Sequence, residues 1–93
     1  MSEESITRRV LFAGRVQGVG FRWTVKKLTG PLPVTGFVRN LSDGRVELTV
    51  CGTETVLGNL LAEISDHFGS GIAAVESERL QRSEDFVDFR IRR

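Results

Sequence analysis

Cysteine and histidine are scarce in this chain, and long apolar runs are missing from it. Among the 93 residues there is one cysteine, Cys51, and one histidine, His67. A single cysteine excludes an internal disulfide and the CxxC spacing of metal or redox sites. No apolar run approaches the roughly 20 residues that a membrane-spanning helix needs, and the polar start of the chain lacks the apolar core of a secretory signal. We therefore expect a cytoplasmic protein with no membrane partner and no metal or other cofactor.

An excess of either charge is also missing. Thirteen Lys and Arg residues stand against twelve Asp and Glu residues, which leaves a formal net charge of +1. Because nucleic-acid-binding domains usually carry a strongly basic face, this balance argues against a nucleic-acid partner. A chain of this length buries one core rather than two. The sequence therefore predicts a flexible tail over residues 1–6 and a single domain over residues 7–93, which we expect to be a monomer.

Glycine, by contrast, is concentrated in residues 14–22, which read GRVQGVGFR. Glycine adopts left-handed backbone angles without strain, so successive N–H groups can point at one anion. Arg22 falls in the first turn of an expected helix, where the helix dipole disfavours a cation unless an anion lies between them. Its planar guanidinium matches phosphate or carboxylate oxygens. Taken alone, these residues fit a phosphate site and, equally well, a glycine-rich turn with an ordinary surface arginine.

The chain resembles the acylphosphatase family, and two motifs carry the resemblance. The first family motif, GxVQGVxFR, is matched at every specified position by residues 14–22. The second, G(W/F)VxN followed by DGxVE, is matched by residues 36–40 and 43–47. The resemblance implies a metal-free hydrolase that cleaves the carboxyl–phosphate bond of acyl phosphates to a carboxylate and inorganic phosphate, with phosphate also a competitive inhibitor.

The resemblance also assigns roles within the two motifs. It implies that Arg22 binds the phosphoryl group and that Asn40 positions the attacking water, both as catalytic residues. The expected phosphate-binding residues are Gln17, Gly18, Val19, Gly20, Phe21 and Arg22. We interpret Asp43 as part of an Asp-Gly turn and Glu47 as a residue on a solvated strand face, and expect neither to be catalytic. Arg15 and Arg39 either add positive potential to the site or are ordinary solvated side chains.

The apolar pattern predicts an α+β fold. The expected strands cover residues 8–14, 34–40, 45–51, 73–80 and 86–91. One helix starts at Phe21 and ends before Gly30-Pro31, and a second runs from an N-cap at Thr53 to Gly69. The order β-α-β-β-α-β, with one extra strand, is that of the ferredoxin-like split β-α-β sandwich, with two helices on one face of an antiparallel sheet of four to five strands.

This topology brings the two motifs together. The first two strands run parallel with the third between them, so their carboxyl ends emerge at one edge of the sheet. The glycine-rich loop follows the first strand and Asn40 ends the second. Family members often carry Gly near the end of the first helix and Ala on its packing face, where this chain has Pro33 and Thr29. We therefore expect a shorter first helix with an unaffected N-terminal end.

Three alternatives remain open at this point. The same type of domain occurs at the N-terminus of a hydrogenase-maturation carbamoyltransferase, so the substrate of this chain is an ordinary acyl phosphate or carbamoyl phosphate. A non-catalytic phosphate-binding or interaction module would keep the same residues. An RNA-binding module of related fold would need aromatic residues on its central strands, and the strand over residues 45–51 has none.

Overall fold

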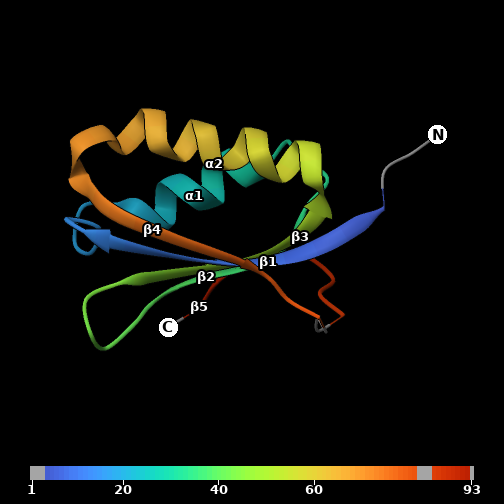
Figure 1. The fold of residues 1–93 in the computed structure, drawn as a ribbon, viewed down its shortest axis with the longest axis horizontal. Helices are drawn as coiled ribbons and strands as arrows, with labels where there is room; N and C mark the ends of the chain where they lie inside the picture. The colour runs from blue at the N-terminus through green and yellow to red at the C-terminus, as the bar shows by residue number, and fades with distance from the viewer. Residues whose placement is uncertain (1–3, 82–84, 93) are drawn as a thin grey trace.

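Two helices cover one face of a five-stranded sheet in the computed structural model of this chain, which describes residues 4–81 and 85–92 (Figure 1). The elements in chain order are β1 (Ser5–Gly14), α1 (Phe21–Thr29), β2 (Thr35–Asn40), β3 (Val46–Thr53), α2 (Glu54–Phe68), a short 3-10 turn η1 (Gly69–Gly71), β4 (Ile72–Arg79) and β5 (Phe89–Arg92). The strand order is β4-β1-β3-β2-β5. The predicted ferredoxin-like α+β architecture is confirmed.

The register of the sheet places the ends of β1 and β2 side by side. Strand β3 is antiparallel to both, and Phe12 of β1 and Asn40 of β2 both pair with Val46 of β3. The carboxyl ends of β1 and β2 therefore lie at the same edge of the sheet. Figure 1 shows the loop after β1 and the β2–β3 hairpin at this common end.

The fifth strand makes the sheet mixed. Strand β5 pairs with β2 in parallel, with Gly36 opposite Phe89 and Val38 opposite Ile91, whereas the other four strands form antiparallel pairs. Strand β4 runs opposite to β1 and β2, and the chain reverses direction as it crosses to the other edge of the sheet, so β5 runs in the same direction as β2. Strand β5 contacts α1, and the Arg92 carbonyl accepts a hydrogen bond from Arg22 in the first turn of that helix.

The core fixes the position of the N-terminal end of α1. Phe21, the first residue of α1, is 1% exposed. Its ring centroid lies 5.1 Å from that of Phe12 and 4.4 Å from that of Phe68. Fully burying an aromatic side chain of this size contributes roughly 1.5–3 kcal/mol. The phenyl ring therefore anchors the helix start, and with it the glycine-rich loop, to the sheet and to α2.

The expected start of the first strand differs from the observed one, whereas the expected end of the first helix does not. Strand β1 begins at Ser5, inside the expected tail over residues 1–6, because Ile6 is buried and pairs with Gly52; residues 1–3 of that tail lie outside the described residues. Helix α1 ends at Thr29, directly before Gly30-Pro31, as the sequence predicts. The Thr29 hydroxyl donates to the carbonyl of Lys26 at 2.9 Å, which helps to close the last turn.

The interpretation of Glu47 as a solvated residue is wrong. Its side chain lies on the sheet face without helices, yet Glu47 is 4% exposed. It accepts hydrogen bonds from Arg39 Nε at 2.7 Å and from Thr49 Oγ1 at 2.9 Å, and Arg9 Nε lies 3.4 Å away. Burial alone would raise the pKa of Glu47, but the two hydrogen bonds and the charges of Arg39 and Arg9 outweigh it and lower the pKa. Two long arginine side chains from neighbouring strands thus cover this carboxylate.

Candidate active site

A hollow of about 260 Å³ opens at the end of the sheet where β1 and β2 finish. Its lining residues come from the glycine-rich loop, α1, β2 and β5: Val16, Gly18, Gly20, Phe21, Arg22, Trp23, Asn40 and Ile91. Most small-molecule pockets measure about 300–1,000 Å³, so this hollow suits a group of a few heavy atoms. The fold thus brings Arg22, in the first turn of α1, and Asn40, at the end of β2, to one place.

Two glycines give the loop its shape. Gly18 has φ 73° and Gly20 has φ 77°, both in the left-handed region. A Cβ atom at either position would meet no heavy atom within 4 Å. The requirement for glycine is therefore conformational, because an L-residue with a side chain would lose about 1–2 kcal/mol at such angles.

The loop leads into a helix start that the protein does not cap. Gly20 is the N-cap of α1 and has no side chain to accept a hydrogen bond, and the first turn has no acidic residue. The first backbone bond is from Thr24 N–H to the Gly20 carbonyl, at 2.9 Å. Within the described residues, the backbone N–H groups of residues 18–23 have no acceptor. Such a helix end carries partial positive charge and several free donors, which is the arrangement that binds phosphate in other folds.

Arg22 adds a full positive charge to this helix end. Its side chain is half-exposed, and its Nη1 donates a long hydrogen bond of 3.4 Å to the Arg92 carbonyl. Among the described residues, no carboxylate lies within ion-pair distance of Arg22. An anion in the hollow would compensate both the guanidinium and the helix dipole.

Asn40 lines the same hollow and carries an unpaired acceptor. Its Oδ1 atom is buried and has no hydrogen-bond partner in the described part of the chain. An unsatisfied buried acceptor costs about 1–3 kcal/mol, and a water molecule is the ordinary partner for such an atom. The neighbouring Arg39 points to the opposite face of the sheet and pairs with Glu47. Asn40 is therefore the polar side chain that β2 contributes to the hollow.

Gln17 has a contact that the sequence analysis missed. Its side-chain Nε2 donates to the carbonyl of Leu41 at 2.8 Å and to that of Arg45 at 2.9 Å. Leu41 N–H in turn donates to the Arg45 carbonyl at 2.8 Å. The amide of Gln17 therefore ties the glycine-rich loop to the base of the hairpin that follows Asn40. Gln17 and Val19 belong to the loop but do not line the hollow.

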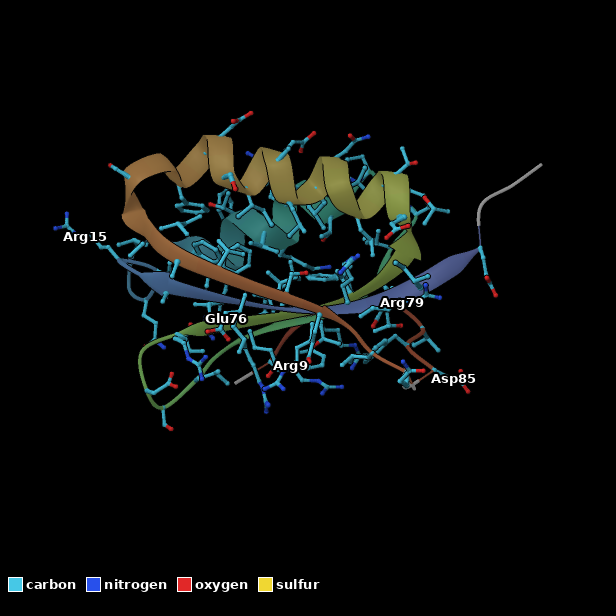
Figure 2. The ribbon with its side chains drawn as sticks, in the orientation of Figure 1. Arg9, Arg15, Glu76, Arg79 and Asp85 are labelled. Atoms are coloured by element: carbon cyan, nitrogen blue, oxygen red, sulfur yellow. The ribbon has the colours of Figure 1, made fainter. Side chains whose placement is uncertain are left out.

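The other candidate residues lie away from the hollow. Arg15 is exposed and points outward beyond the end of the sheet (Figure 2), and its N–H donates to the Gly71 carbonyl at 2.7 Å. Cys51 and His67 do not line the hollow either. Within residues 4–81 and 85–92, no group of three or more His, Cys, Asp or Glu side chains is placed to hold a metal ion. No helix in that part of the chain has the length and apolar character needed to cross a bilayer.

Fold and site together define a ferredoxin-like α+β domain in which a glycine-rich loop, Arg22 and Asn40 line a hollow at the carboxyl ends of β1 and β2. A family model described as Acylphosphatase matches residues 8–91. The chain therefore belongs to the acylphosphatase family. This membership and the fold support acyl phosphate hydrolysis in general terms, and an enzyme of this type.

Similar proteins agree with this assignment. The chain is 41% identical over 92 residues to an acylphosphatase of Koribacter versatilis (strain Ellin345), covering 98% of this chain and 84% of that protein. The structure of an acylphosphatase from Coxiella burnetii superposes with a TM-score of 0.83 at 36% identity, over 95% of this chain and 93% of the other. Full-length HypF in its phosphate- and nucleotide-bound form superposes with a TM-score of 0.87 at 27% identity, over 98% of this chain but 12% of the HypF chain.

Proposed function

We propose that this chain hydrolyses acyl phosphates without a metal ion, using Arg22 and the glycine-rich loop to bind the phosphoryl group and Asn40 to position the water. One observation carries the proposal. The hollow combines an uncapped helix start, an arginine without a described carboxylate partner, and a buried unpaired amide oxygen. Among the described residues the helix start and the amide oxygen have no hydrogen-bond partner and the arginine has no carboxylate partner, and a phosphoryl group with an attacking water would complete all three.

The cradle binds the phosphoryl oxygens. The backbone N–H groups of residues 17–21 and the guanidinium of Arg22 donate to them, and the dipole of α1 favours their negative charge. In phosphoryl transfer the charge spreads over the three equatorial oxygens of the transition state. Donors that are fixed before the reaction stabilise that charge without reorganising, and Phe21 in the core holds the helix start in place.

Asn40 acts on the water rather than on the phosphate. Its Oδ1 accepts a hydrogen bond from the water and holds it in line with the bond that breaks. The water oxygen forms a bond to phosphorus, the bond between phosphorus and the acyl oxygen breaks, and the acyl group leaves as a carboxylate. The proton of the water passes to the phosphate product or to solvent. A carboxylate is a good leaving group, so positioning and charge neutralisation are sufficient and no strong base is required.

The unit that carries out this reaction is one copy of the domain over residues 7–93. Carbamoyl phosphate is the second candidate substrate, because the resemblance extends to the N-terminal domain of a hydrogenase-maturation carbamoyltransferase. The apolar side chains of Trp23 and Ile91 at the hollow favour an acyl group over the polar carbamoyl amide.

A hydrolysis assay tests the proposal. Purified protein is mixed with benzoyl phosphate, and benzoate release is followed by ultraviolet absorbance with and without EDTA. We expect turnover that EDTA does not change and that inorganic phosphate inhibits competitively. His67→Ala is a control, because His67 is exposed and lies outside the hollow. Turnover that requires added Mg²⁺ would contradict the metal-free mechanism, and no turnover would contradict the proposed activity.

A further inference from the structure

Two exposed apolar side chains line the hollow and a third belongs to the glycine-rich loop beside it; we call the three the apolar rim. They are Val19, 45% exposed, Trp23, 64% exposed, and Ile91, 38% exposed. Trp23 and Ile91 line the hollow, and Val19 lies between two lining glycines, Gly18 and Gly20. Exposed apolar side chains gathered at one site are typical of a binding surface, whereas single ones are ordinary.

The rim is assembled from three separate parts of the chain. Val19 comes from the glycine-rich loop, Trp23 from the first turn of α1 and Ile91 from β5. The hydrogen bond between Arg22 Nη1 and the Arg92 carbonyl joins α1 to β5 next to the rim. Lys27 Nζ lies 5.2 Å from the centre of the Trp23 ring, one helical turn further on, and this cation–π contact holds the indole against the helix.

The core does not explain the position of Trp23. About two-thirds of its surface is in water, while the residues that hold α1 against the sheet are Phe21 and Val25, at 1% and 0% exposure. When an apolar group of a ligand covers an exposed indole, both remove apolar surface from water, which favours binding. An aromatic ring in that position gains a further contact with the indole ring. The fold therefore leaves most of the indole open to a ligand.

We infer that the apolar rim binds the acyl group, and that the preferred substrates are acyl phosphates whose acyl group is aromatic or otherwise large and apolar. This inference rests on the proposed function. A single oxygen links the phosphorus to the acyl carbon, so a phosphoryl group held by Arg22 leaves the acyl group within reach of the neighbouring Trp23. Acetyl and carbamoyl groups offer the rim little or no apolar surface, and gain little from it.

The first test compares substrates of different acyl size. kcat/KM is measured for benzoyl, acetyl and carbamoyl phosphate with the unmodified protein, Trp23→Ala, Trp23→Phe and a control variant. For Trp23→Ala we expect kcat/KM for benzoyl phosphate to fall about tenfold more than that for acetyl phosphate, on the scale of one aromatic contact. Trp23→Phe should recover most of the preference, because it keeps an aromatic ring. Val75→Ala is the control, since Val75 is 47% exposed but lies on β4 outside the hollow.

A second test measures binding without turnover. Trp23 is the only tryptophan in the chain, so the intrinsic fluorescence reports on the rim alone. Benzylphosphonate should shift the emission to shorter wavelength as its ring covers the indole, and methylphosphonate or inorganic phosphate should shift it much less. Equal shifts for all three anions would overturn the inference.

The substrate comparison separates the two proposals. Equal losses of benzoyl and acetyl phosphate turnover in Trp23→Ala would overturn the apolar rim as an acyl site and leave the proposed hydrolysis standing. No hydrolysis of any of the three substrates by the unmodified protein would overturn the proposed function and the inference that rests on it.

Discussion

Replacing Asn40 by alanine should slow turnover sharply without weakening phosphate binding or the fold. The substitution removes Oδ1, the buried acceptor that has no partner in the described protein, and leaves the loop, the start of α1 and Arg22 unchanged. Losing one positioned hydrogen bond in the transition state lowers kcat by about 10²–10³-fold, or roughly 2.7–4 kcal/mol. Because the unpaired oxygen itself costs about 1–3 kcal/mol, the free energy of unfolding should stay the same or rise.

Three measurements on Asn40→Ala check this reasoning: kcat with benzoyl phosphate, the competitive inhibition constant of inorganic phosphate, and the melting temperature. A loss of kcat with an unchanged inhibition constant is the pattern of an interaction made mainly in the transition state. Asn40→Asp serves as a second variant of the same size, and its carboxylate beside the cradle should weaken phosphate binding. Normal turnover in Asn40→Ala, or a loss of phosphate affinity as large as that of Arg22→Ala, would refute the assignment of Asn40 to the water.

Three further predictions follow from the same structure. Arg22→Ala should weaken phosphate inhibition and lower kcat by about 10³-fold in the benzoyl phosphate assay. Arg22→Lys should not recover the lost activity, because an ammonium lacks the planar paired donors of a guanidinium. Full activity in Arg22→Lys would contradict the role given to the guanidinium. Gln17→Ala removes two hydrogen bonds to the β2–β3 hairpin and should lower kcat about tenfold, with a smaller effect on phosphate inhibition. Gln17→Glu should lower kcat further, because a carboxylate cannot donate to two carbonyls. The pKa of Glu47 is lowered, so its ion pairs stabilise the fold at neutral pH, and this contribution is lost as the pH falls below the ordinary value of 4.5. Glu47→Gln should therefore lower the free energy of unfolding in urea at pH 7 by about 1–2 kcal/mol. An equal difference between Glu47→Gln and the unmodified protein at pH 3 would contradict this prediction.

The fold and the meeting of the two motifs were predictable from the sequence because local patterns determine them. Alternating apolar residues such as Val46, Leu48 and Val50 define a strand with one buried face, and glycine, proline and Thr53 mark where elements end. Once the order of elements is known, the rules of strand connection bring the loop after β1 and Asn40 to the same edge. No contact between distant residues has to be known for this step.

The contacts that the sequence analysis missed all depend on the register between distant segments. Glu47 is an ordinary polar residue in an alternating strand, and its burial requires Arg39 and Arg9 to lie on either side of it in the sheet. The amide of Gln17 finds its acceptors more than twenty positions further along the chain. Ile91 reaches the hollow only because β5 pairs in parallel with β2. Composition and periodicity carry no information about such cross-strand partners.

Binding of a phosphoryl group by the glycine-rich loop and the start of α1 is tested most directly by titrating the ¹⁵N-labelled protein with inorganic phosphate. The NMR signals of the backbone amides are recorded at each phosphate concentration. At constant ionic strength, with chloride as the control anion, we predict saturable shifts for the amides of residues 17–22 and none for the helix-free face around Glu47. Shifts that centre on the arginines of that face, or no shifts at millimolar phosphate, would contradict the account.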